Sequence, residues 1–176
     1  LCPYLVSDLN IQHYIWGFMH FSREQVVFQE VPDEVSLAYT ISGCPLRCPG
    51  CHSADTWPAG AGTLLSEDYF RQRLQTYAGL ISCVLFMGGE WLEAQLLPLL
   101  KLARQQGLKT CLYTGHDRIT PELEAELTYL KTGPWIRELG GLDSPTTNQR
   151  FIDLRLSLIP ILRCRRPYAC HSRVLA

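Results

Sequence analysis

The 176-residue sequence has almost no net charge and no long hydrophobic run. Its 16 basic and 17 acidic side chains leave a formal charge of -1, so no overall attraction to nucleic acid or to an anionic membrane is expected. No apolar stretch approaches the ~20 residues that a transmembrane helix needs. Internal repeats and low-complexity stretches are also lacking. We therefore expect no nucleic acid and no membrane as partners, and one domain whose 47% apolar residues build a core.

The sequence also lacks a convincing export signal and an initial methionine. The segment before the first methionine, Met19, has no basic beginning and carries Asp8, Asn10 and Gln12. We expect residues 1–18 to be a non-native or disordered extension, with translation starting at Met19. The expected location is the reducing cytoplasm, where clustered cysteines more often bind metal or act in redox chemistry than form disulfides.

Hydrophobic patterning predicts alternating strands and helices. Strands are expected at 35–42, 81–87, 108–113 and 129–131, where short apolar runs end at or shortly before a glycine. Helices are expected at 66–77 with Ser66 as N-cap, at 92–106 with Pro98 starting or kinking the main part, and from Thr120 onward. This alternation is typical of an α/β fold class with a parallel sheet or a partial barrel.

The last 22 residues, 155–176, differ from the rest of the chain. They contain five arginines and no acidic side chain. One interpretation is a flexible basic tail that touches an acidic partner; the other, which we prefer, is a poorly ordered or non-native terminus. Cys164 and Cys170 lie in this segment, and nothing else in the sequence supports a second metal site there.

The strongest chemical signal is a loop with three cysteines directly after the first expected strand: Cys44, Cys48 and Cys51. Thiolates are the usual protein ligands of iron–sulfur clusters. Three of them can hold three irons of a cubane and leave the fourth iron open for chemistry. The alternative is a structural zinc site completed by His52. Zinc usually prefers four ligands in separated pairs, and His52 directly follows Cys51, which is awkward geometry.

Two further motifs also follow expected strands. Gly88-Gly89-Glu90 comes after 81–87, and Tyr113-Thr114-Gly115 comes after 108–113. Each motif alone is a common type of turn. In parallel α/β sheets, however, ligands bind at the carboxyl edge of the strands, so the cysteine loop and both motifs are expected on one rim. Cys83 and Cys111 lie inside the expected strands and are predicted to be inert core residues.

The spacing Cys-x3-Cys-x2-Cys resembles the signature of radical S-adenosylmethionine (radical SAM) enzymes. The resemblance implies a [4Fe-4S] cluster on Cys44, Cys48 and Cys51 whose open iron chelates S-adenosyl-L-methionine. One electron then splits a carbon–sulfur bond and yields a 5′-deoxyadenosyl radical. The resemblance also implies a small, partial (open) parallel β/α barrel. Besides the cluster ligands it implies no catalytic residue, but a set of cofactor-binding residues: Gly50, His52, Gly88, Gly89, Glu90, Tyr113 and Thr114.

Within this superfamily, residues 129–136 and 138–151 resemble the activating proteins of anaerobic (class III) ribonucleotide reductases. The similarity covers about 19–154, which we expect to be the radical SAM domain, although many relatives carry Asp where this chain has Lys131 or Thr132. The implied partners are the anaerobic ribonucleoside-triphosphate reductase, which receives a glycyl radical, and an electron donor such as flavodoxin. Asn148, Gln149 and Arg150 either pair with the partner's backbone or form an exposed turn.

Two other functions stay open at this point. One is a small radical SAM enzyme that acts on a free metabolite, such as a pterin-derived base. The other is a non-catalytic zinc-binding module that uses the three cysteines and His52.

Overall fold

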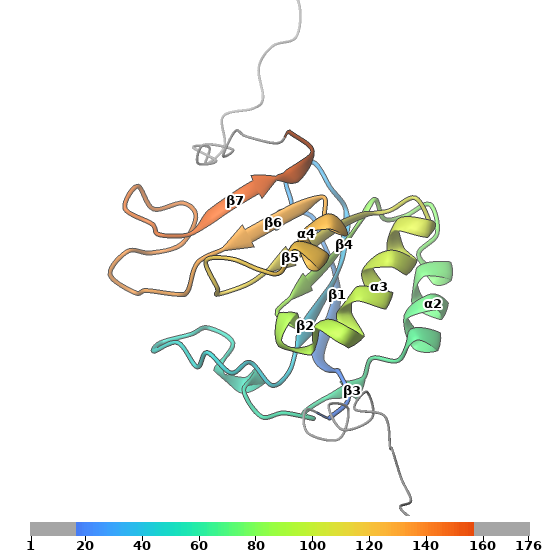
Figure 1. Cartoon of the computed structure of the whole chain (residues 1–176), viewed down its shortest axis with the longest axis horizontal. Coiled ribbons are helices and arrows are strands. Elements are labelled where there is room, and N and C mark those ends of the chain that lie inside the picture. Colours follow the sequence, from blue (N-terminus) through green and yellow to red (C-terminus); the bar gives the residue numbers. More distant parts are fainter. Residues whose placement is uncertain (1–16, 157–176) are drawn as a thin grey trace, which may run out of the picture.

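The computed structural model describes residues 17–156 (Figure 1). The expectations for residues 1–16 and 157–176, including those for Cys164 and Cys170, lie outside the described residues. One seven-stranded sheet has the order β3-β1-β2-β4-β5-β6-β7. Its four central strands are parallel to one another: β2 (Ser36–Ile41), β4 (Cys83–Met87), β5 (Lys109–Tyr113) and β6 (Tyr129–Thr132).

Three antiparallel strands flank this parallel centre, and the sequence patterns did not predict them: β1 (His20–Val27), β3 (Thr63–Leu64) and β7 (Arg150–Asp153). β1 is hidden in the sequence because a register shift near Arg23 breaks its alternation. The α/β class is confirmed. The expected partial parallel barrel is found only as an open, mixed sheet, which does not close and carries antiparallel pairs on both sides of its parallel centre.

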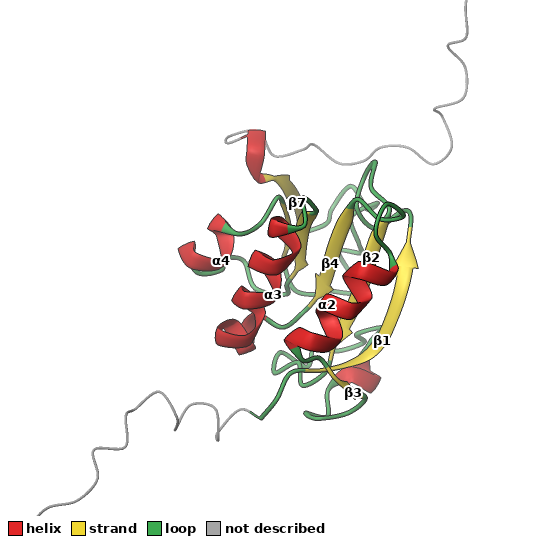
Figure 2. Cartoon of the chain, turned by 90° about the vertical axis from the view of Figure 1, so that its right-hand side faces the viewer, coloured by secondary structure: helices red, strands yellow, loops and turns green. Residues whose placement is uncertain are grey.

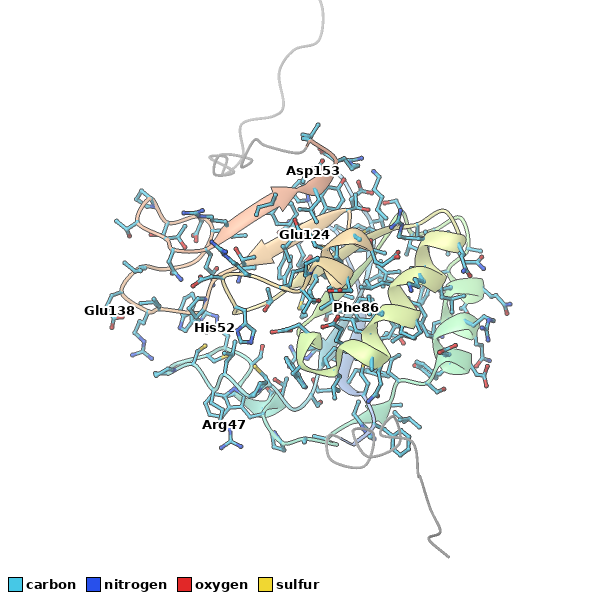
Figure 3. All side chains as sticks on the ribbon, in the orientation of Figure 1. Arg47, His52, Phe86, Glu124, Glu138 and Asp153 are labelled. Atoms are coloured by element: carbon cyan, nitrogen blue, oxygen red, sulfur yellow. The ribbon has the colours of Figure 1, made fainter. Side chains whose placement is uncertain are left out.

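The three α-helices in residues 17–156 cover the same face of the sheet (Figure 2). They are α2 (Glu67–Thr76), α3 (Glu93–Gln105) and α4 (Pro121–Ala125). Ser66 caps α2 by accepting a hydrogen bond from the Tyr69 amide at 3.1 Å, as expected. α3 begins at Glu93 and runs through Pro98, so Pro98 does not start the helix. Apolar side chains of these helices pack on strand residues such as Phe86, which is labelled in Figure 3.

The opposite face of the sheet has its own apolar cluster, to which no described helix contributes. Val31, from the turn between β1 and β2, packs there, and the Tyr113 hydroxyl donates a hydrogen bond to the Glu30 carbonyl of the same turn. Cys83 and Cys111 are fully buried in this cluster, and burial raises the pKa of Cys83 to about 12. Both thiols are therefore inert core groups, as predicted.

Paired charges hold the amino edge of the parallel strands. Glu34, which is 4% exposed, accepts hydrogen bonds from the Lys109 ammonium and from the Tyr129 hydroxyl. Arg155 donates to Asp153 at 2.9 Å and to the Tyr129 oxygen at 3.1 Å (Asp153 is labelled in Figure 3). The end of β7 is thereby tied to the start of β5 and β6. Across residues 17–156, no helix is long and apolar enough to span a bilayer.

Candidate metal centre at the carboxyl edge of the sheet

The cysteine loop leaves the carboxyl end of β2 and folds back on itself (Figure 1). The Gly43 amide donates to the Thr56 carbonyl at 2.7 Å and closes the loop, and the Cys51 amide donates to the Cys48 carbonyl at 3.1 Å. Gly50 supplies the left-handed conformation (φ 72°) that this inner turn requires. The cysteine side chains are therefore carried by a loop with a fixed backbone.

The three thiols of this loop are half-buried, and none forms a disulfide: Cys44, Cys48 and Cys51. Burial raises the pKa of the Cys44 thiol, while the amides of Leu46 and Arg47 oppose this shift through hydrogen bonds to the sulfur. The Ser53 amide donates to the Cys51 sulfur at 3.4 Å. Hydrogen bonds to sulfur are one of the means by which proteins tune cluster thiolates.

The donor set fits a [4Fe-4S] cluster better than a single metal ion. In residues 17–156, no three histidine, cysteine, aspartate or glutamate side chains are arranged to hold one ion. In a cubane, each thiolate ligates a different iron, so three ligands need not converge on one point. The His52 ring packs against the Trp135 ring with 4.7 Å between centroids, and His52 belongs to no such group of three ligands in the described residues. Three thiols with backbone donors to two of them suit an iron–sulfur cluster.

The two glycines after β4 are required by the backbone. Gly88 and Gly89 both adopt positive φ, at 86° and 106°. A Cβ on Gly88 would lie 2.7 Å from the Trp91 ring, and the Gly88 amide donates to the Tyr113 carbonyl at 2.8 Å. These constraints turn the chain sharply, so that Glu90 follows at the carboxyl edge of the sheet.

The Glu90 carboxylate is buried and only partly satisfied. The Thr114 hydroxyl donates to its Oε1 atom at 2.7 Å, and the His116 amide in turn donates to the Thr114 oxygen at 3.0 Å. The Glu90 Oε2 atom is buried without a hydrogen-bond partner, and burial raises the pKa of Glu90. A buried oxygen in this state is able to accept a hydrogen bond from a bound ligand.

The structure brings the cysteine loop, Glu90 and Thr114 together. Thr114 binds Glu90 through its hydroxyl, and the next residue, Gly115, lies against the cysteine loop. Leu46 of the loop lies 2.5 Å from the position of a Cβ on Gly115. A cavity of about 290 Å³ opens beside Glu90, and its lining includes Trp91, His116 and Arg118 but no residue of the cysteine loop.

Tyr113 is placed differently from its neighbour Thr114. Its ring packs with the apolar cluster on the face opposite to the helices, and its hydroxyl is engaged by Glu30. The ammonium of Lys131 lies 5.6 Å from the Tyr113 ring centroid. The structure therefore does not bring the Tyr113 hydroxyl to Glu90.

The loop between β6 and β7, residues 133–149, covers the cysteine loop and was missed as part of the site. Trp135 contacts His52, and the Arg137 guanidinium lies 2.9 Å from the position of a Cβ on Gly50. Figure 3 shows this arrangement with His52 facing the covering loop and Arg47 pointing away from the sheet. The sequence carries no local signal for such contacts between distant segments.

The side-chain amides of Asn148 and Gln149 form hydrogen bonds within this covering loop. They donate to the carbonyls of Pro134 and Gly133 at 3.0 and 3.4 Å, and so join the two ends of the loop. Gln149 is 9% exposed, so the interpretation as an exposed turn is wrong for that residue. Of the three residues, Arg150 is exposed, Asn148 is half-buried and Gln149 is buried.

A model of the 4Fe-4S single cluster domain family matches residues 35–131, which is more than half of the chain. The chain belongs to this family. It is also 35% identical over 79 residues to the pyruvate formate-lyase-activating enzyme of Clostridium pasteurianum. That match covers 42% of this chain and 33% of the relative, so the chain spans about a third of that enzyme's length. The family and the donor set agree on a [4Fe-4S] cluster.

Proposed function

We propose that this chain is a radical SAM enzyme that activates a glycyl-radical enzyme, with the anaerobic ribonucleoside-triphosphate reductase as its protein substrate. The observation that carries the proposal is that Thr114 binds Glu90 and that Leu46 of the cysteine loop packs beside Gly115, at the carboxyl edge of the parallel strands. Similarity to an activating enzyme supports the reaction class. The resemblance of residues 138–151 to class III reductase activating proteins supports the choice of substrate.

Each motif has a role in this proposal. Cys44, Cys48 and Cys51 hold the cluster. When bound together with S-adenosylmethionine, the cluster supplies one-electron cleavage to methionine and a 5′-deoxyadenosyl radical, which takes an α-hydrogen from a glycine of the partner. Glu90 offers its free Oε2 atom to the amino group of the methionine moiety, and Thr114 fixes the orientation of that carboxylate.

The loop 133–149 limits access to the cluster in this proposal. Trp135 contacts His52 and Arg137 lies against Gly50, so this loop shields the cysteine loop from water on one side. An electron donor such as flavodoxin delivers the reducing electron, and both partners belong to the cytoplasm.

The experiment uses the full chain, loaded with iron and sulfide without oxygen. With dithionite and S-adenosylmethionine it forms 5′-deoxyadenosine, and with purified anaerobic ribonucleotide reductase it produces a glycyl EPR signal. C44A, C48A and C51A abolish both products, whereas C83A, which changes a buried thiol far from the edge, retains them. A loaded chain that cleaves S-adenosylmethionine but gives no glycyl signal with the reductase contradicts the proposed substrate.

Pyruvate formate-lyase is the second candidate substrate, because the curated relative is a pyruvate formate-lyase-activating enzyme. The same EPR assay with this protein in place of the reductase distinguishes the two. A free metabolite as substrate is recognised by hydrogen transfer from the labelled metabolite into 5′-deoxyadenosine in the absence of any partner protein.

A further inference from the structure

Lys131 is a half-buried cation at the carboxyl edge of β6, and nothing in the proposed reaction uses it. It pairs in register with Tyr113 of β5, and its ammonium lies 5.6 Å from the centroid of that ring. Among residues 17–156, no carboxylate forms an ion pair with it. By contrast, Lys109, at the other end of the neighbouring strand, is paired with Glu34.

A half-buried ammonium without a carboxylate partner is stabilised when an anion binds near it. Withdrawing an ammonium from water is unfavourable, and the face of one tyrosine offsets only part of that cost. Burial lowers the pKa of Lys131 to about 8, and the charges of Cys48 and Cys51 oppose that shift. Lys131 also lies near the carboxyl end of β6, directly before the loop 133–149 that contacts the cysteine loop.

The segment after Lys131 contacts the cysteine loop. Pro134 lies beside Gly115 where Leu46 of the cysteine loop also packs. Trp135 contacts His52, immediately after Cys51 in the chain. The strand that carries Lys131 thus continues directly into segments that contact the cysteine loop.

We propose that the Lys131 ammonium is the fixed counter-charge of the cluster held by Cys44, Cys48 and Cys51, and that it strengthens cluster retention and favours the reduced state. Three thiolates and a cubane together carry negative charge, which grows by one on reduction. A nearby fixed cation stabilises the reduced state more than the oxidised one. The inference rests on the cluster of the proposed function and not on the identity of its protein substrate.

The test is an EPR-monitored redox titration of the full chain, loaded with iron and sulfide without oxygen. K131M keeps a chain of similar length against Tyr113 but removes the charge, and K131R keeps the charge. K101M is the matched control, because Lys101 is an exposed lysine on α3. We expect K131M to disfavour reduction about tenfold, which is a midpoint about 59 mV more negative for one electron. K131R and K101M keep the wild-type midpoint.

Iron retention under a chelator is the second readout. Faster iron loss from K131M than from K131R supports the inference, and so does a folded K131M chain that takes up no cluster while K131R loads normally. An unchanged midpoint in K131M overturns it. If K131M and K131R both fold but fail to load, shape and not charge matters at this position, and the inference is also overturned. A wild-type chain that holds no cluster instead contradicts the proposed function itself.

Discussion

The buried charged side chains are paired at the amino edge of the parallel strands and incompletely paired at the carboxyl edge. At the amino edge, Glu34 is met by Lys109 and by hydroxyl donors such as Tyr129. At the carboxyl edge, Glu90 keeps one oxygen without a partner, and Lys131 has no carboxylate partner in the described part of the chain. Charges that are fully paired hold a fold together, whereas unsatisfied ones retain capacity for a ligand. The comparison separates a structural edge from a binding edge.

We expect the largest loss of stability from a substitution at the amino edge. E34Q leaves the Lys109 ammonium without its counter-charge, and we expect a loss of about 2–3 kcal/mol in the free energy of unfolding, less than for a fully buried pair because Lys109 is partly exposed. E90Q removes a carboxylate that burial already disfavours, so it should change stability little. Urea unfolding of both variants as metal-free chains measures the difference. Equal losses at the two edges would remove the distinction.

The second prediction concerns the turn that carries Glu90. G88A forces a side chain into a positive φ and places its Cβ 2.7 Å from the Trp91 ring, so we expect a loss of about 2 kcal/mol in unfolding free energy. G60A is the control, because Gly60 has a similar φ of 75° but open space around its Cβ position. It should lose only about 1 kcal/mol. Identical losses would show that the Trp91 contact does not constrain Gly88.

The pH dependence of stability should have opposite signs at the two edges. Burial alone raises the pKa of Glu34, but hydrogen bonds from Lys109, Ser82 and Tyr129 outweigh it, so the net pKa is lowered. Its stabilising effect is therefore present above about pH 4.3, the ordinary glutamate value, and is lost as the pH falls through the lowered pKa. The raised pKa of Glu90 gives the reverse: its contribution is present below about pH 4.3 and is lost as the pH rises through the raised value.

Urea unfolding of wild type, E34Q and E90Q from about pH 2 to pH 7 checks this contrast, because the Glu34 change falls below about pH 4.3 and the Glu90 change above it. The stability advantage of wild type over E34Q should grow with pH, and its advantage over E90Q should shrink. Two slopes of the same sign would contradict the assignment of the two edges.

We expect the smallest effect from a substitution of Thr114, on the KM for S-adenosylmethionine. T114V removes the hydroxyl that donates to Glu90 at 2.7 Å, and we expect a severalfold higher KM for S-adenosylmethionine in 5′-deoxyadenosine formation, about 1 kcal/mol. T114S retains the donor and should restore the wild-type KM. A T114V enzyme with unchanged KM would leave Thr114 a purely structural residue.

Local patterns in the sequence predicted the elements that carry the site. Ser66 marked the start of α2, and glycines marked the strand ends where Glu90 and Thr114 lie. β1 escaped because its exposed Ser22 and Arg23 interrupt the alternation of buried residues. β7 was not predicted because it is only four residues long and is separated from its partner β6 by the long loop 133–149.

The remaining features depend on contacts between distant segments. Whether a glutamate in a turn is buried cannot be read from its neighbours, and Glu34 meets Lys109 across 75 positions. The contact of His52 with Trp135 and the position of Lys131 beside Tyr113 likewise arise only when β6 pairs with β5. Tyr113 and Thr114 are neighbours in the sequence, but side chains alternate between the two faces of a strand. Tyr113 therefore packs on the face opposite to the helices, while Thr114 binds Glu90.

The most direct test of the account measures iron and acid-labile sulfide in the chain purified and reconstituted without oxygen. The account predicts about four of each per wild-type chain, with a brown colour, and loss of both in the variant that lacks Cys44, Cys48 and Cys51. A colourless chain with zinc and no labile sulfide, or an unchanged cluster in that triple variant, would contradict it.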